Sequence, residues 1–218
     1  MSRTGHKILE RYGMTEAGMI TSNPLDGERV PGTVGFALPN VTLRICNDDG
    51  EVIPAGQQRP GTLELRGPNV FEGYWRKPNS TQSEFREDGF FVSGDVAQIA
   101  SDGRITIVGR KRDVVISGGL NVYPREIECC LNQLSGITES AVVGVPHNDY
   151  GETLVAIVAG DPDLMPDEGD IISLLQLELA SFKIPRRVFF LDELPKNTMG
   201  KVQKDILRKR YVPLASTS

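Results

Sequence analysis

Hydrophobic and polar residues alternate along much of the first half of the chain, which is the pattern of half-buried β-strands. One helical segment interrupts the strands near residues 80–86, where Asn79 or Ser80 follows Pro78 as the predicted N-cap. Asp-Gly turns separate the alternating runs, as in antiparallel hairpins. We therefore expect a small twisted barrel or sandwich of antiparallel strands. The alternating runs cover residues 42–45, 61–66, 98–100 and 104–108.

After Arg112 the pattern changes to strands that alternate with helices. Helices are predicted from Pro124, over residues 166–180 and near residues 203–211, because apolar residues recur there at helical spacing. Helices packed on a small sheet make a compact α+β unit. The apolar side of the second helix is expected to hold Ile171, Leu174, Leu175 and Leu179. The predicted strands cover residues 113–117, 120–123, 139–145, 153–159 and 187–191.

The two patterns together predict an α+β protein with two domains. The charged segment 109–113 does not suit a hydrophobic core, and the change in pattern occurs there. We expect a β-rich, barrel-like domain over residues 1–111 and a small α+β domain over residues 112–218.

Composition narrows the class of protein. The chain has 218 residues, 39% of them hydrophobic and 24% charged, which is typical of a folded globular protein. Its net charge of −5 argues against nucleic-acid binding, which usually leaves a basic surface. No apolar run is long enough to span a membrane and the start at Met1 has no hydrophobic leader, so we expect a cytoplasmic protein. Structural thiols are expected at Cys46, Cys129 and Cys130.

The segment Tyr12-Gly-Met-Thr-Glu16 is the first candidate for chemistry. Gly13 is expected to let the backbone turn sharply after a short strand. Thr15 and Glu16, side by side at a strand end, could hold Mg²⁺ and a phosphate oxygen, and Tyr12 could stack on a flat base. On spacing alone, an ordinary turn with a polar pair is the stronger alternative.

Three further positions carry chemistry in the same conditional way. Asp95 follows Gly94 at the expected end of a strand and could accept two hydrogen bonds from a ribose diol, or be a simple turn residue. The cations at 110–112 could clamp phosphate at a hinge, or form a solvated face. Lys201, directly after Gly200, could stabilise a phosphoryl transition state, or lie on the surface.

The order of these motifs resembles that of the AMP-forming acyl-CoA synthetases of the adenylate-forming superfamily, which also includes peptide-synthetase adenylation domains and firefly luciferase. Within that family, segments 3–16 and 197–204 resemble malonyl-CoA synthetases in particular. The similarity extends over essentially the whole chain. The motifs that carry it are 12–16, 67–75, 88–95, 109–128, 182–185 and 195–201.

The resemblance implies an ATP-dependent acid–CoA ligase that forms an acyl-adenylate and then a CoA thioester. It implies that Glu16 holds Mg²⁺, that Thr15 contacts the α-phosphate and that Tyr12 stacks on adenine. It implies further that Asp95 binds the ribose hydroxyls, with help from Arg110.

The second domain receives its implied roles in the same way. Arg112 falls at the family's hinge position, and Lys201 matches the lysine that bridges the carboxylate and the α-phosphate during adenylation. The loop of Ser117, Gly118 and Gly119 matches the one that lines the pantetheine path after the small domain rotates.

One departure limits these implications. Members of the family are more than twice as long and carry an upstream phosphate-binding loop that this sequence lacks. We therefore expect the C-terminal part of a synthetase, without its N-terminal portion and inactive alone. Its expected substrates are ATP with Mg²⁺, coenzyme A and a small carboxylic acid such as malonate. The alternatives are a non-catalytic module that binds nucleotide, CoA or a partner chain, and a relative that loads a carrier protein or oxidises its adenylate.

Overall fold

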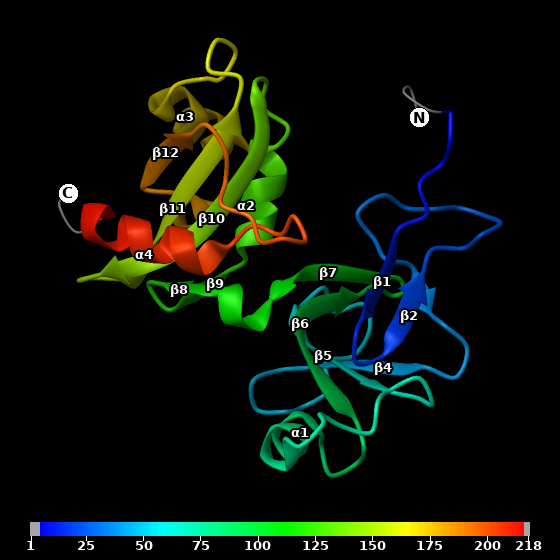
Figure 1. Ribbon diagram of the computed structural model, residues 1–218. Helices are drawn as coiled ribbons and strands as arrows, with labels where there is room; N and C mark the ends of the chain where they lie inside the picture. The colour runs from blue at the N-terminus through cyan, green and yellow to red at the C-terminus, as the bar shows by residue number, and fades with distance from the viewer. Residues whose placement is uncertain (1–4, 216–218) are drawn as a thin grey trace. The chain divides into compact units, whose positions relative to one another are not determined.

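The computed structural model describes residues 5–215 and divides into two compact units, Met1–Lys111 (unit 1) and Arg112–Ser218 (unit 2). Residues 1–4 lie outside the described residues. They include Met1, where we expected no hydrophobic leader, and Arg3 and Thr4 of segment 3–16. Strands and helices are both present, so the α+β class is confirmed (Figure 1).

Unit 1 consists of two antiparallel sheets and one short helix. The first sheet, β1-β2-β3, was not predicted, and the second follows the chain as β4-β5-β6-β7. The predicted strands at residues 42–45, 61–66, 98–100 and 104–108 are confirmed within the second sheet. The strands are β1 Arg11–Met14, β2 Gly18–Ser22, β3 Phe36–Ala37, β4 Thr42–Cys46, β5 Gly61–Arg66, β6 Phe91–Ile99 and β7 Ile105–Arg110, and the helix is α1 Pro78–Glu84.

The four-stranded sheet does not close into a barrel in the part of the chain described. Other segments meet the edges that closure would join: Val52 bridges to Cys46 on β4, and Gly35 bridges to Ile105 on β7. The predicted N-cap of helix α1, Asn79 or Ser80, is wrong. Lys77 is the N-cap, without a side-chain hydrogen bond, because Pro78 already occupies the first helical turn.

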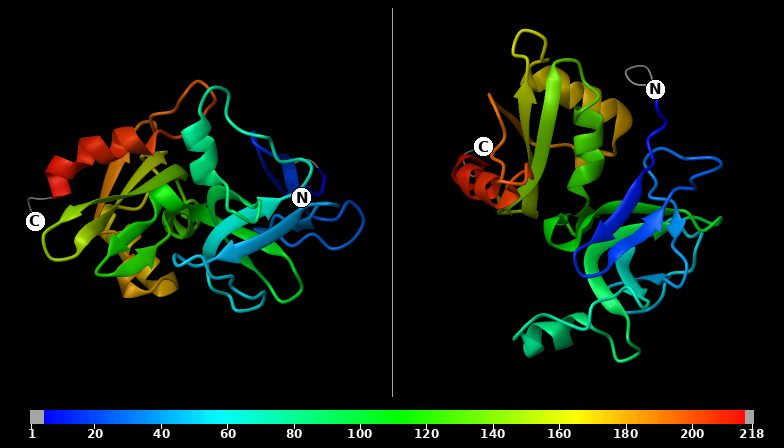
Figure 2. Two further views of the ribbon diagram at one scale, coloured as in Figure 1. Left: turned by 90° about the horizontal axis from the view of Figure 1, so that it is seen from below. Right: turned by 45° about the vertical axis from the view of Figure 1, so that its right-hand side comes forward.

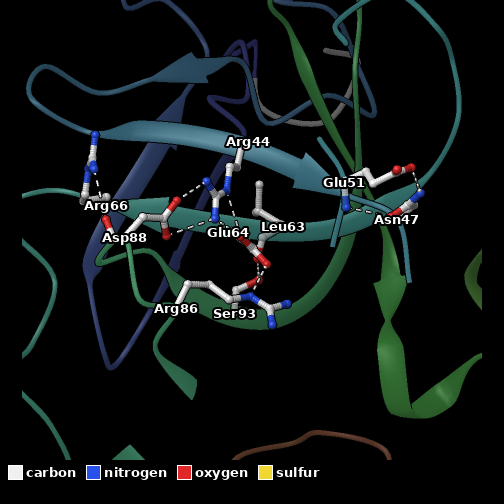
Figure 3. Close-up of polar contacts among 9 residues, drawn as sticks. All are labelled: Arg44, Asn47, Glu51, Leu63, Glu64, Arg66, Arg86, Asp88 and Ser93. Carbon is white, nitrogen blue, oxygen red and sulfur yellow. Dashed lines mark hydrogen bonds and ion pairs between the residues drawn. The ribbon is translucent and has the colours of Figure 1, made fainter. Parts of the chain in front are cut away.

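A buried carboxylate lies within the four-stranded sheet. Glu64 of β5 is fully buried, and its two oxygens contact Arg44 and Arg86 at 2.8 Å each (Figure 3). Arg44 also pairs with Asp88 at 2.5 Å, and its guanidinium lies 3.9 Å from the centre of the Phe90 ring. Because each charge has partners, this cluster ties β4 and β5 to the segment that leads into β6.

Unit 2 is built on the long antiparallel pair β10 and β11. Strand β12 pairs with β11 in parallel, and a short hairpin of β8 and β9 joins β11 where Ser117 is paired with Gly151. The strand and helix predictions for this half are confirmed in number and order. The elements are β8 Val115–Ser117, β9 Leu120–Val122, α2 Pro124–Leu131, β10 Ile137–His147, β11 Gly151–Gly160, α3 Glu168–Glu178, β12 Arg187–Leu191 and α4 Lys204–Ala215.

Both faces of this sheet are covered. Helices α2 and α3 pack on one face through Ile127, Leu131, Ile171 and Leu175, and α4 packs on the other through Leu207 and Tyr211 (Figure 2). Leu174, predicted on the same apolar side of its helix, is instead 39% exposed. The residues of β10 and β11 are therefore buried almost without alternation, which is typical of strands with helices on both sides.

Candidate functional site

Three of the predicted residues meet in unit 1. Tyr12 comes from β1, Asp95 from β6 and Arg110 from β7, where it is the register partner of Asp95. The Tyr12 hydroxyl donates a hydrogen bond to the Asp95 carboxylate, and Arg110 Nε lies 2.8 Å from Asp95 Oδ1. A sequence separation of 83 residues between Tyr12 and Asp95 is thus closed by the packing of the two sheets.

We expected Asp95 at the end of a strand. It is instead a buried residue in the middle of β6. Gly94 has φ +71°, so the strand bends just before the carboxylate. The Asp95 backbone N–H donates to Ser93 Oγ at 3.1 Å, and that hydroxyl donates to the Leu63 carbonyl at 2.8 Å (Figure 3 shows the latter bond). Ser93, which sequence reasoning missed, therefore fixes the bend that presents Asp95.

The electrostatics of this group favour a neutral tyrosine. Burial and the hydrogen bond to Asp95 raise the pKa of the Tyr12 hydroxyl above its ordinary value of 10.0. Asp95 is only 3% exposed, whereas the Arg110 side chain is 48% exposed.

Thr15 and Glu16 lie in the turn that follows β1. Gly13 does not form that turn, so its expected role is wrong: it lies within β1, where a Cβ atom would approach the Gly18 carbonyl oxygen to 2.3 Å. Thr15 is exposed and Glu16 half-buried. Glu16 Oε1 lies 3.0 Å from the hydroxyl of Tyr74, a residue that the sequence analysis did not single out.

The same tyrosine contacts a second carboxylate. The Tyr74 hydroxyl lies 2.8 Å from Glu84 Oε2 at the end of α1, and burial together with the two carboxylates raises the pKa of Tyr74 above 10.0. Within residues 5–215, no cluster of three or more His, Cys, Asp or Glu side chains forms a metal centre. A single carboxylate such as Glu16 can still contribute to a Mg²⁺ site, because this ion is commonly held by one or two carboxylates and by the phosphates of a nucleotide.

The predicted pantetheine loop in unit 2 is a two-residue hairpin turn between β8 and β9. Gly118 and Gly119 both have positive φ, +58° and +80°, as this kind of tight turn requires. The Gly118 N–H donates to the Tyr150 carbonyl at 3.0 Å, which ties the turn to the start of β11. Ser117 lies at the end of β8, before the turn.

Lys201 lies on a second tight turn. The Asn197 side-chain oxygen accepts hydrogen bonds from the N–H groups of Met199 and Lys201, at 3.0 and 2.9 Å. Gly200 has φ +77°, which this turn requires, and the space where a Cβ atom would lie is open. The Asn-x-x-Gly spacing was the sequence signal for Asn197, which we did not use.

A cavity of about 340 Å³ opens beside this turn, and it brings two predicted residues together. Arg112, the expected hinge residue, and Lys201 both line it, with Lys204 as a third cation and Asp113 and Asp205 as acidic neighbours. Lys204 is fixed at the start of α4 by an ion pair of 2.6 Å with Glu128 of α2. Unit 2 thus holds a mixed-charge pocket in which Lys201 is exposed.

Comparisons with known proteins identify the family of the chain that carries these two sites. The family description "AMP-binding enzyme" matches residues 1–75, and "AMP-binding enzyme C-terminal domain" matches residues 126–201. Together the two ranges cover more than half of the chain. The chain belongs to the AMP-binding enzymes.

Relatives of this AMP-binding chain agree with the assignment. A long-chain-fatty-acid–CoA ligase of Yersinia pestis is 38% identical over 98% of this chain, and the mitochondrial malonate–CoA ligase ACSF3 of Mus musculus is 39% identical over 100%. The crystal structure of ATP-bound MatB from Rhodopseudomonas palustris is 51% identical over 98% of this chain, with a TM-score of 0.92. The chain spans 38%, 40% and 42% of these three proteins, respectively.

None of α1 to α4 within residues 5–215 combines the length and the apolar composition that a bilayer crossing demands.

Proposed function

We propose that this chain is the nucleotide-contacting and lysine-bearing part of an ATP-dependent acid–CoA ligase, in which unit 1 ends the large domain and unit 2 is the small domain. The convergence of Tyr12, Asp95 and Arg110 carries the proposal. A base-stacking ring, a ribose-binding carboxylate and a cation are the groups that a nucleotide requires. CoA-ligase names among the relatives support the second half of the reaction.

Unit 1 acts on the nucleotide. The Asp95 carboxylate accepts the ribose hydroxyls, and the Tyr12 ring stacks on the base. Arg110 orients the carboxylate through its ion pair. Thr15 contacts the α-phosphate from the turn after β1, and Glu16 supplies a carboxylate for Mg²⁺, which screens phosphate charge when bound.

Unit 2 acts on the reacting groups. Lys201 stabilises the charge that develops between the substrate carboxylate and the α-phosphate, and the Asn197 turn fixes the backbone from which it reaches. The turn of Ser117, Gly118 and Gly119 lines the pantetheine path in the second step. Arg112, exposed at the boundary of the two units, absorbs the change in backbone angles between the steps.

The proposed acid is small, with malonate as the first candidate. One of the similar proteins supports this choice, since ACSF3 is named a malonate–CoA ligase. The acyl pocket itself is not formed by the residues assigned here, so an experiment on this chain tests its ligase chemistry and not the choice of acid.

A hybrid protein provides the test. In this hybrid, the chain replaces the matching C-terminal part of the Rhodopseudomonas palustris protein, of which it covers 42%. We expect malonate-dependent ATP–pyrophosphate exchange and CoA thioester formation from the hybrid, and neither from this chain alone. The matched control is the hybrid with Lys201→Ala.

Two results would contradict the proposal. A folded hybrid without exchange on malonate or on other short carboxylic acids would exclude the ligase activity. Nucleotide binding without any exchange would instead favour the non-catalytic module.

A further inference from the structure

Tyr74 lies between two carboxylates of unit 1 that come from different elements. Glu16 follows β1, Glu84 ends α1, and the Tyr74 hydroxyl reaches the first at 3.0 Å and the second at 2.8 Å. The proposed nucleotide contacts do not involve Tyr74. Its hydroxyl nevertheless contacts Glu16, the proposed Mg²⁺ ligand.

The ring is held rigidly in that place. The Tyr74 N–H donates to Thr81 Oγ1 at 2.9 Å, and the ring packs edge-on against Phe71 with 4.8 Å between centroids. Phe71 in turn donates its N–H to the Glu16 carbonyl at 2.8 Å. The segment that carries Tyr74 is therefore attached to the backbone of Glu16 itself, so the hydroxyl and the carboxylate keep a fixed relation.

A hydroxyl has one proton and two carboxylates compete for it here. It donates to the carboxylate with the greater negative charge, since a hydrogen bond to a charged acceptor is the stronger one. A cation bound at Glu16 offsets the negative charge of this carboxylate, which makes Glu16 a weaker hydrogen-bond acceptor. Glu84 is then the better acceptor.

We propose that Tyr74 is a positioning residue for Glu16, and that Glu84 accepts its hydrogen bond whenever Glu16 engages a divalent cation. The inference rests on the proposed function, in which Glu16 is the Mg²⁺ ligand. Without the cation, Tyr74 holds the Glu16 carboxylate in the orientation seen here. With the cation, the hydrogen bond passes to Glu84 and Glu16 remains in place.

The test compares the Mg²⁺ dependence of the hybrid with its Mg²⁺-independent binding of AMP. Because Tyr74→Phe removes a hydrogen bond to a carboxylate both with and without the cation, the Mg²⁺ concentration for half-maximal exchange should change by less than about twofold. AMP affinity measured without Mg²⁺ should not change. Glu87→Gln, at an exposed neighbouring position, is the matched control for lost charge.

Glu84→Gln tests the second half of the inference. A neutral acceptor leaves the hydroxyl on Glu16, where it competes with the cation, so this variant alone should need more Mg²⁺, by about threefold. Because Glu84 acts only through the hydroxyl, the double variant should match Tyr74→Phe alone. Additive effects, or an equal loss of AMP binding, would show a merely structural role and overturn the inference.

A spectroscopic measurement covers the case in which Tyr74→Phe does not fold. The Cζ resonance of Tyr74 in ¹³C-tyrosine-labelled hybrid should shift on addition of ATP with Mg²⁺ and not with AMP alone. No shift in an active hybrid contradicts this inference while the proposed function stands. An inactive wild-type hybrid contradicts the proposed function instead.

Discussion

The two units hold their candidate residues in opposite ways. In unit 1, Asp95 is 3% exposed and is bound by side chains from two other strands. In unit 2, Lys201 and Gly118 are exposed, and only the backbone of their turns is fixed. Residues of the first kind contribute to both stability and binding, whereas residues of the second kind are separable from the fold. Substitutions should therefore give different signatures in the two units.

The largest effect is expected for Lys201→Ala in the hybrid. Removal of one electrostatic donor should slow adenylate formation by at least about 10²-fold, while thioester formation from preformed adenylate continues. Because Lys201 is exposed, the free energy of unfolding should change by less than about 0.5 kcal/mol. Single-turnover rates of the two steps check this, with the exposed Lys209→Ala as control. Equal loss in both steps would contradict it.

Asp95→Ala should show the opposite signature, a loss of stability as well as of nucleotide affinity. The change leaves a buried tyrosine hydroxyl without its acceptor, which costs about 2 kcal/mol. Amide hydrogen exchange at Leu63 and Leu65 of β5 measures it in the intact chain. Asp48→Ala, at a position 79% exposed, should cost no more than about 0.5 kcal/mol. Similar exchange in both variants would remove the distinction between the units.

Substitutions of Gly118 distinguish two reasons for a glycine at this position, a narrow pantetheine path or a positive φ angle. A leucine at φ +58° costs about 1–2 kcal/mol, and an asparagine of similar size costs less. If the turn lines the pantetheine path, Gly118→Leu and Gly118→Asn should both impair thioester formation while adenylate formation continues. If only the backbone angle matters, Gly118→Asn should be close to wild type in both steps. Thermal unfolding measured beside the two rates separates the explanations.

The smallest effect concerns alkaline pH. Because burial raises the pKa of Tyr12 in the folded chain, its contribution to stability is complete below the ordinary tyrosine pKa of 10.0 and is lost as the pH rises above it. Tyr12→Phe should therefore lose less stability than wild type between about pH 10 and 11. Tyr150→Phe, at a position 51% exposed, should follow the wild type. Denaturation at a series of pH values provides the measurement, and parallel curves for all three proteins would contradict the assignment.

The sequence predicted the elements whose signal is local. Alternation around Asp-Gly turns located β6 and β7, and helical spacing located α2 through Ile127 and Leu131. The three-stranded sheet at the start was missed because its strands have two to five residues, and β1 contains a bulge next to Gly13. Leu174 was misplaced because helical spacing alone does not show how wide the covered stripe is.

The candidate site was predictable residue by residue but not as an assembly. Resemblance pointed to Tyr12, Asp95 and Lys201, and each motif is short and local. The bond between Tyr12 and Asp95 depends on the packing of two sheets, which no local pattern encodes. Tyr74 was missed for the same reason, because its partners Glu16 and Glu84 lie 58 and 10 residues away.

The two-sided sheet of unit 2 has a consequence for biosynthesis. All strands and the helices α2 and α3 have left the ribosome once residue 191 is free, so one face of the sheet can close at that time. The other face, with Val143, Val155 and Ile157, waits for α4 at residues 204–215. At about 5–20 residues per second, the delay is on the order of seconds. During that interval the nascent chain exposes an apolar strip that chaperones recognise, and its last helix ends this exposure.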